Sequence, residues 1–315
     1  MKKISIIVPI YNVSEYIDRM MENLLYQEYA NTEIILVDDG STDDSLDKCN
    51  KYKTLDKRVK VIHQNNSGVS VARNVGIKKS TGDFIAFVDS DDVISKSMLS
   101  VLYNNLVETE SDISVCNYVV FKDSMPIFDN DNNITIYSKM DALKDIITDS
   151  KLSSFLWNKL FKRELFDNIK FPEGKIFEDL YVMPKLIEKA NRVCYTNMKL
   201  YGYYVRSNSY VNTYSKEKNN NFLAFSNECY EYLLKYPSLK ENCEDYKLFY
   251  IYSAFLKASK SHSLDIIKSD NMNDEYKYFK NNFKLSKTLS LKRRILYCIL
   301  YINKNLFYRL ITIIK

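Results

Sequence analysis

The sequence predicts an α/β domain built on a mostly parallel sheet, followed by an α-helical region. Within residues 1–120, short apolar runs of strand length alternate with segments of helical length, a pattern typical of βαβ units. From about residue 215 onward the pattern is helical, with very little glycine or proline. A chain of 315 residues is long enough for two units. We therefore expect a domain at 1–210 and a helical region at 211–315.

The elements of the first domain follow from these patterns in chain order. Buried strands are expected at residues 4–9, 33–37, 59–63, 84–88 and 113–120. Helices are expected between them, at residues 14–27, 45–55, 69–79 and 95–108. The polar, turn-rich segment 121–137 predicts an exposed loop or hairpin, and 138–206 returns to short helices and strands.

Composition narrows the possible chemistry. The six cysteines are scattered and form no CxxC pair, which favours reduced thiols in the cytosol over a zinc site. Only His63 and His262 are present, so carboxylates are favoured as the reacting groups. The apolar run at residues 4–9 is too short for a signal-peptide core, and no stretch reaches the length of a membrane-spanning helix. We expect a cytoplasmic protein.

The strand predicted at residues 84–88 delivers three carboxylates, Asp89, Asp91 and Asp92, to its carboxyl end. Ligands of open α/β sheets bind just beyond this end of the strands. Carboxylates so close together repel one another unless a cation lies between them. A hard divalent cation that also holds phosphate oxygens fits this pattern.

Polar loops also follow the three earlier strands. Tyr11 can cover the face of a base, Asp38 or Asp39 can accept a hydrogen bond from a base N–H, and Arg73 can complement a phosphate or a carboxylate. Taken singly, each has an ordinary explanation as a turn, a helix cap or a surface ion pair. Together they predict a site for one nucleotide at this edge of the sheet.

Four segments, in this order and spacing, closely resemble the signatures of family 2 glycosyltransferases. They are residues 6–12 (IIVPIYN), 37–43 (VDDGSTD), 67–76 (SGVSVARNVG) and 89–92 (DSDD). The resemblance implies a GT-A fold, in which helices flank a Rossmann-like mixed sheet. It implies a nucleotide-diphosphate sugar donor, with a UDP-sugar expected, bound together with Mn²⁺ or Mg²⁺, and transfer with inversion at the anomeric carbon.

The resemblance also assigns roles within the site. Residues 1–120 become the nucleotide-sugar-binding half and residues 121–210 the half that holds the acceptor and the base. Asp91 becomes the metal ligand, and Asp89 faces the ribose or the metal. The implied nucleotide-sugar pocket comprises Pro9, Tyr11, Asn12, Asp38, Asp39, Gly68, Arg73, Asp89, Ser90 and Asp91.

An inverting transferase needs a carboxylate base on a segment separate from the metal site. Glu178 and Asp179 begin a helical stretch, where acidic residues are ordinarily dipole or capping features. Because the family places its base at this distance after Asp-x-Asp, the resemblance assigns Asp179 as the base and Glu178 as the second choice. By the same resemblance, Trp157, Asn158, Lys159 and Arg206 are candidate contacts to the acceptor or the diphosphate, although Trp157 alone also fits a packing role and Arg206 a surface arginine.

The C-terminal region is strongly basic. Ten lysines and arginines and no acidic residue follow Glu275, although the whole chain carries a net charge of only +5. Basic, aliphatic and aromatic helices of this kind bind the surface of anionic membranes. We expect peripheral contact with the inner face of the cell membrane; packing on the catalytic domain or on a second subunit stays open. The aliphatic content disfavours nucleic acid.

Two alternative functions stay open from the residues. The segment 87–93 also fits a haloacid dehalogenase-type phosphatase with Asp89 as the nucleophile, but in those enzymes the motif opens the fold, whereas three strand units precede it here. A catalytically inactive sugar-nucleotide-binding protein is the other alternative. The resemblance favours a hexosyl- or N-acetylhexosaminyltransferase acting on a glycan or lipid-linked glycan in bacterial surface-polysaccharide synthesis.

Overall fold

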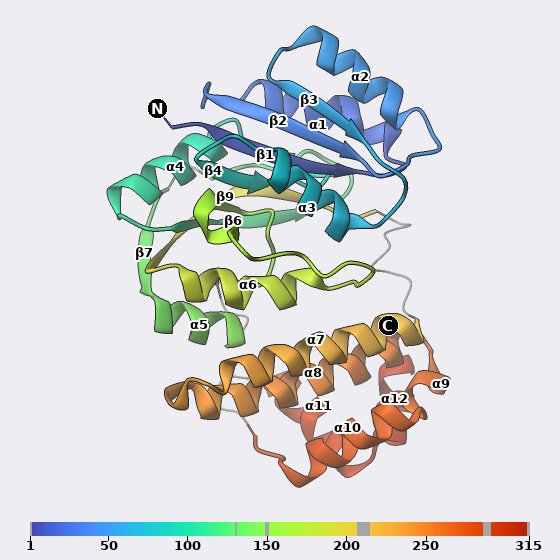
Figure 1. Cartoon of the computed structure of the whole chain (residues 1–315). Helices are drawn as coiled ribbons and strands as arrows, with labels where there is room; N and C mark the ends of the chain where they lie inside the picture. The colour runs from blue at the N-terminus through green and yellow to red at the C-terminus, as the bar shows by residue number, and fades with distance from the viewer. Residues whose placement is uncertain (1, 130, 149–150, 207–214, 286–290, 314–315) are drawn as a thin grey trace. The chain divides into compact units, whose positions relative to one another are not determined.

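The computed structural model describes residues 2–129, 131–148, 151–206, 215–285 and 291–313. The chain divides into two compact units, Met1–Arg206 and Ser207–Lys315 (Figure 1). The first is α/β and the second is α-helical, which confirms the predicted fold class.

In the described part of the first unit, nine strands form one mixed sheet in the order β3-β2-β1-β4-β8-β6-β9-β5, with β7 paired to β9. Strands β1 (Ile4–Ile10), β2 (Thr32–Asp38), β3 (Val59–His63) and β4 (Phe84–Phe87) are parallel, as the sequence predicts. Their carboxyl ends therefore lie along one edge of the sheet.

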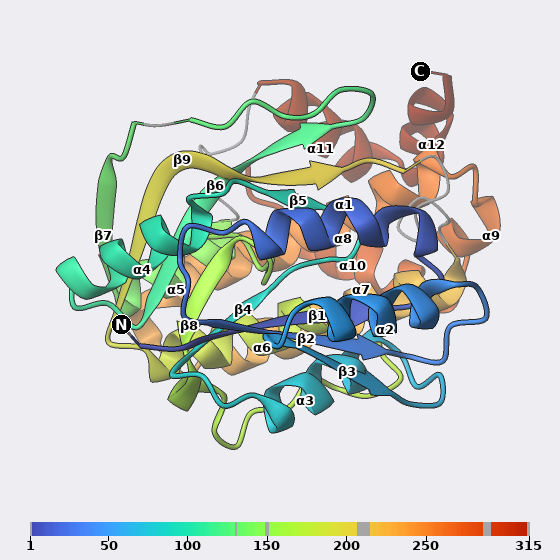
Figure 2. The ribbon, with the colours of Figure 1, turned by 90° about the horizontal axis from the view of Figure 1, so that it is seen from above.

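The helices between these strands cover both faces of the sheet. They are α1 (Ser14–Leu25), α2 (Ser45–Leu55) and α3 (Val69–Lys79), and Figure 2 shows α1 and α3 on opposite sides of β1 and β2. Leu36 of β2 belongs to the same core as Met20 of α1, whereas Ile35 packs with Ala72 of α3. Alternate residues of one strand thus enter two cores, which explains why the strands read as continuous apolar runs.

The rest of the sheet is less regular than predicted. It contains β5 (Val93–Ile94), β6 (Ile113–Phe121), β7 (Ile134–Ser138), β8 (Lys159–Lys162) and β9 (Arg192–Tyr204). Strand β8 lies between β4 and β6 and runs antiparallel to both, so the expectation of a mostly parallel sheet holds only for the first half. An apolar run marks a strand but not its direction.

Four further elements complete this unit: α4 (Met98–Glu108), α5 (Lys139–Thr148), the 3₁₀ turn η1 (Arg163–Phe166) and α6 (Glu178–Lys189). The segment predicted as a loop or hairpin does contain a strand, β7, but β7 pairs with β9 and makes no hairpin with β6. Helix α6 begins with the two acidic residues Glu178 and Asp179 that the sequence analysis singles out.

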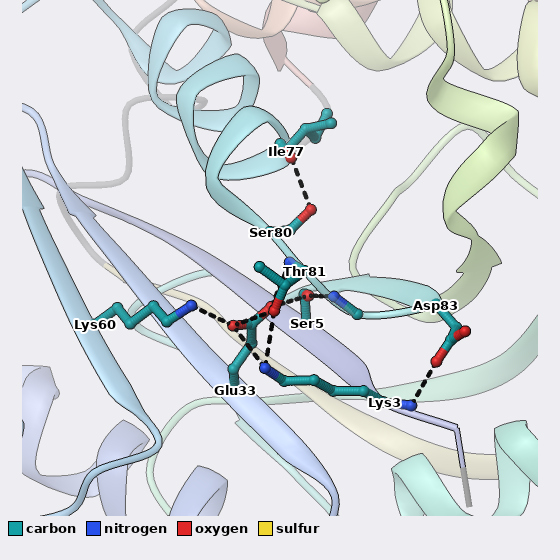
Figure 3. Close-up of polar contacts among 9 residues, drawn as sticks. Lys3, Ser5, Glu33, Lys60, Ile77, Ser80, Thr81 and Asp83 are labelled. Carbon is teal, nitrogen blue, oxygen red and sulfur yellow. Dashed lines mark hydrogen bonds and ion pairs between the residues drawn. The ribbon is translucent and has the colours of Figure 1, made fainter.

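A buried carboxylate holds together the amino-terminal edge of the sheet (Figure 3). The Glu33 side chain is 2% exposed and accepts hydrogen bonds from Ser5 Oγ at 2.6 Å and from the Thr81 N–H at 2.6 Å. Lys60 Nζ and Lys3 Nζ lie 2.6 and 3.1 Å from its Oε2 atom. Glu33 therefore joins β1, β2, β3 and the turn before β4, a role for which the sequence around it carries no local signal.

We expect Glu33→Ala to lower the free energy of unfolding by about 3 kcal/mol. This value is at the low end of the cost of breaking a buried ion pair, because Lys3 and Lys60 both remain partly exposed to water. Although burial raises the pKa of Glu33, hydrogen bonds from Lys60, Ser5 and Thr81 lower it well below its usual value of 4.5. The contribution is therefore complete above about pH 4.5 and is lost as the pH falls further. Urea unfolding of wild type and variant across pH 3–7 measures both effects; an equal loss at every pH would contradict the account.

The second unit contains α7 (Lys216–Leu233), η3 (Pro237–Leu239), α8 (Lys240–Lys260), α9 (Leu264–Ile267), α10 (Asp270–Asn281), α11 (Leu291–Ile302) and α12 (Lys304–Ile313). Tyr252 of α8 packs against Tyr297 of α11 and Phe307 of α12, with ring centroids 4.5 and 5.9 Å apart. Across the described residues, no helix combines the length and the apolar character needed to cross a membrane.

Candidate active site

The loops after β1 and β2 are fastened to each other at the carboxyl edge of the sheet. Asn12 adopts a left-handed backbone conformation, with φ of 50°. Its N–H donates to Ser41 Oγ at 3.1 Å, and its side-chain oxygen accepts from the Thr42 N–H at 2.8 Å. A non-glycine residue held in this region is often part of a functional site. Tyr11, just before it, is 47% exposed, so its ring is open to a ligand.

The acidic pair after β2 divides into two different environments. Asp39 accepts hydrogen bonds from the N–H groups of Ser67 and Gly68, at 2.8 and 2.7 Å. It therefore positions the start of α3, where Gly68 has a φ of 91°. Asp38 is fully buried, and its Oδ2 atom lies 2.7 Å from His63 Nδ1. Asp38 and Asp39 are both candidates to contact the nucleobase. Of the two, Asp39 is the one that borders the loop between β3 and α3.

Arg73 connects the two halves of the predicted site. Its guanidinium is buried and forms ion pairs with Asp89, at 3.3 Å, and with Glu178. The centre of the guanidinium lies 5.8 Å from the Phe171 ring centroid. Burial opposes the charge, but Glu178 and Asp89 raise the pKa of Arg73. One cation thus joins the strand-end carboxylates to the amino terminus of α6.

The carboxylates after β4 have separate roles. Asp91 Oδ2 lies 2.6 Å from Arg206 Nε, and burial and the Asp89 charge raise the pKa of Asp91. Asp92 is 1% exposed and accepts from Tyr201 Oη and from the Tyr204 N–H, both at 2.7 Å. Asp92 therefore ties this loop to β9, whereas the Asp89 and Asp91 side chains keep 32% and 14% of their surface exposed and pair with Arg73 and Arg206.

Asp89 and Asp91 fit a divalent cation that is shared with phosphates. Among the residues the structure describes, no group of three or more His, Cys, Asp or Glu is arranged to hold a metal alone. Two carboxylates supply hard oxygen ligands and leave the other positions to phosphate oxygens and water, as Mg²⁺ sites commonly do. Carboxylate and phosphate oxygens also suit Mn²⁺.

Asp179 differs from its neighbour Glu178 in the groups it faces. Phe177, with a φ of 65°, precedes them and turns the chain sharply into α6. Glu178 points to Arg73, whereas Asp179 Oδ2 accepts from Ser154 Oγ at 3.2 Å. Burial and the Glu178 charge raise the pKa of Asp179 to about 7. A carboxyl group with a pKa near neutrality is suited to general-base catalysis.

The predicted acceptor residues 157–159 are packed inside the unit. Trp157 is 6% exposed, with the rings of Phe155 and Tyr201 stacked on it at centroid distances of 4.8 and 4.4 Å. Asn158 and Lys159 are almost fully buried and hydrogen-bond to backbone carbonyls. Because β8 is a central strand, the residues at its start enter the core. This burial favours the packing interpretation and leaves these side chains no open surface for an acceptor.

Arg206, by contrast, lies at the carboxylate cluster through its pair with Asp91. Two contacts escaped the sequence analysis: Arg19 of α1 donates to the Asp91 carbonyl oxygen, and Tyr201 Oη accepts from the Asp89 N–H at 3.1 Å. Both hold the Asp89–Asp92 loop in place. An arginine in an amphipathic helix and a tyrosine in a strand carry no local signal for such roles.

Comparison with known proteins extends these observations. The profile of glycosyl transferase family 2 matches residues 5–175, more than half of the chain. The glycosyltransferase GlyA of Streptococcus pneumoniae is 36% identical over 66% of this chain, and the chain spans only 31% of the length of GlyA. TarP of Staphylococcus aureus, a poly(ribitol-phosphate) beta-N-acetylglucosaminyltransferase, is 31% identical over 79% of this chain and 77% of its own length.

Solved structures share the fold. S. aureus TarS 1-349 in complex with UDP-GlcNAc superposes with a TM-score of 0.68 over 98% of this chain and 90% of TarS, at 21% identity. The mannosyltransferase PcManGT of Pyrobaculum calidifontis, in complex with GDP-Man and Mn²⁺, gives a TM-score of 0.59 over 99% of this chain and 87% of its own, at 14% identity. The fold is therefore of the GT-A type, and the chain belongs to glycosyl transferase family 2.

Proposed function

We propose that this protein is a metal-dependent, inverting glycosyltransferase that moves a hexosyl or N-acetylhexosaminyl group from a UDP-sugar to a hydroxyl of a glycan or lipid-linked glycan. The observation that carries the proposal is the Arg73 bridge, in which one guanidinium pairs with both Asp89 and Glu178, the residue before Asp179. This bridge supports a donor site at Asp89 and a proton acceptor at the start of α6 that serve one reaction centre. The acceptors and donors named for TarP and TarS support an N-acetylglucosaminyl donor and a role in surface-polysaccharide synthesis.

The carboxyl edge of the sheet is suited to hold the donor. The exposed ring of Tyr11 can stack on the nucleobase. Asp39 accepts a hydrogen bond from the Gly68 N–H, which shapes that loop, and its carboxylate oxygens can accept a hydrogen bond there. Asp91, with Asp89, would hold Mn²⁺ or Mg²⁺; the Mn²⁺ and GDP-Man bound to PcManGT support a donor site that includes a metal. When bound, the cation neutralises charge on the departing diphosphate. Arg206 lies where it can contact the same phosphates.

The proposed reaction is a single in-line displacement. Asp179 takes the proton of the acceptor hydroxyl while that oxygen forms a bond to the anomeric carbon. The bond between this carbon and the diphosphate oxygen breaks, and the nucleoside diphosphate leaves with the electron pair. Attack from the opposite face inverts the anomeric configuration. Ser154 orients the Asp179 carboxylate by donating to it.

The pH dependence of the reaction follows from the pKa of Asp179, which is raised to about 7. Only the ionised carboxylate accepts a proton, so kcat/KM should rise about tenfold per pH unit below pH 7 and reach a plateau above it. Initial rates at saturating Mn²⁺ across pH 5–9 measure this profile. A rate that is already constant from pH 5 upward would contradict the assignment of Asp179 as the base.

Donor binding is tested with a panel of UDP-, GDP- and dTDP-sugars in the presence and absence of Mn²⁺, read as thermal stabilisation of the chain. We expect a UDP-sugar to raise the melting temperature most, and only with Mn²⁺. If no nucleotide sugar stabilises the protein with Mn²⁺, the proposal fails. Binding without turnover in any acceptor mixture would favour the inactive sugar-nucleotide-binding alternative.

We also propose that the enzyme acts at the cytoplasmic face of the cell membrane. A lipid-linked acceptor would be presented there, and the basic C-terminal region supplies the positive charge that anionic lipids attract.

A further inference from the structure

We infer that α11 and α12 form an amphipathic surface that binds anionic lipid bilayers through the exposed apolar residues of the two helices, here called the outer face. This inference deepens the peripheral membrane contact of the proposed function and rests on it. The outer face consists of five exposed apolar residues: Leu291, Ile295, Ile302, Leu306 and Ile313. They belong to the last two helices of the chain, drawn in red in Figure 1.

The spacing of the outer face matches the helical period. Leu291, Ile295 and Ile302 stand at i, i+4 and i+11 of α11, and Leu306 and Ile313 stand at i and i+7 of α12. Residues at these spacings lie on one side of a helix. Leu291 and Ile313 are 74% and 77% exposed, so each helix presents an apolar stripe to solvent.

These stripes are distinct from the faces that build the core of the second unit. Tyr297 and Phe307 are both buried against Tyr252 of α8. On a helix, Tyr297 is rotated by roughly 160° from Ile295 and by roughly 140° from Ile302, and is therefore on the other side. Because both helices pack on the same α8 residue, the outer stripe of α11 is directed away from α8, and that of α12 flanks its packed face. The helices thus carry more apolar surface than their own core uses.

The charges around the outer face select the partner. Lys292 and Arg309 are exposed on the same two helices, and Lys280 of α10 lies 5.7 Å from the ring of Tyr301, which is itself exposed. No acidic residue follows Glu275 in the sequence, so neither helix contributes a negative charge. Exposed aliphatic stripes with flanking cations, on helices that carry no acid, match the headgroup region of an anionic bilayer. A second copy of the chain would have to bring the same cations face to face, which opposes self-association through this face.

The test is flotation of the full-length protein with vesicles of phosphatidylcholine alone or with about 30% phosphatidylglycerol, a composition chosen to give a negative surface potential. We expect binding to the anionic vesicles only, weakening as salt is raised. Ile295→Gln/Ile302→Gln should lower the bound fraction about tenfold without changing charge, and Lys292→Gln/Arg309→Gln should lower it through charge alone. The matched controls are Leu55→Gln/Val107→Gln and Lys78→Gln/Lys79→Gln, at exposed positions of the first unit, which should bind as wild type does.

Two results would overturn the inference. One is vesicle binding that does not depend on these residues: no binding to anionic vesicles at all, or equal binding by wild type, Ile295→Gln/Ile302→Gln and Lys292→Gln/Arg309→Gln. The other is a dimer in light scattering that Ile295→Gln/Ile302→Gln dissociates, which would make the face a subunit interface. Stabilisation by UDP-sugar and Mn²⁺ is measured on the same variants. Loss of vesicle binding with donor stabilisation retained separates this inference from the proposed function.

Discussion

Asp179→Asn is expected to lower the rate of sugar transfer by about 10²–10⁴-fold, the usual contribution of a general base. The substitution keeps the shape of the side chain and removes its ability to take a proton. Burial and Glu178 already disfavour the charge of Asp179, so its loss should leave the fold intact. Donor affinity should stay near that of wild type, because Glu178 and Arg73 remain paired. Single-turnover rates and donor titrations separate the two effects.

The matched control is Asp167→Asn, an exposed aspartate of the same unit. It should transfer sugar at the wild-type rate. Full transfer by Asp179→Asn would remove Asp179 from the base role. In that case Glu178→Gln becomes the next variant, because Glu178 is the other carboxylate at the start of α6.

Asp91→Asn should weaken Mn²⁺-dependent donor binding by at least about 10–100-fold. Substituting a residue that only hydrogen-bonds to a metal ligand already causes a loss of this size, and Asp91 is proposed as a ligand itself. The substitution removes one of the two carboxylates proposed to hold the metal, and it also removes the ion pair with Arg206. Without Mn²⁺, donor binding by wild type and variant should differ little. Isothermal titration of UDP-sugar with and without Mn²⁺ measures this difference.

Asp47→Asn, at an exposed position of α2, serves as its control and should bind donor as wild type does. A variant at Asp91 that keeps full Mn²⁺-dependent affinity would show that the metal is held elsewhere. Asp92 would not replace it, because that side chain is buried between Tyr201 and the Tyr204 backbone.

Local patterns predict the first half of the fold well. The sequence assigns helices at 45–55 and 69–79 and a strand at 59–63, and the structure has the same bounds. Apolar periodicity and turn residues determine such segments locally. The direction of β8 and the pairing of β7 with β9 depend on contacts between distant segments, which a local pattern does not contain.

The candidate site shows the same division. The motifs predict roles for Asp89, Asp91 and Asp179, and the structure joins the segments of Asp89 and Glu178 through Arg73. The ion pair of Arg73 with Glu178, which links these segments, joins residues 105 positions apart. The sequence around neither residue predicts it. Trp157 illustrates the opposite case: an indole suits either sugar stacking or packing, and only the position of β8 inside the sheet shows that this one is buried.

The most direct test of the central claim is release of nucleoside diphosphate from a UDP-sugar by the wild-type protein, with Mn²⁺, after chelation by EDTA, and after Mn²⁺ is restored. We predict release that stops with EDTA, returns with Mn²⁺, and in the presence of an acceptor is about 10²–10⁴-fold slower in Asp179→Asn. No release from any nucleotide sugar, or release that EDTA and Asp179→Asn both leave unchanged, would contradict the assignment of this site as the centre of a glycosyltransferase.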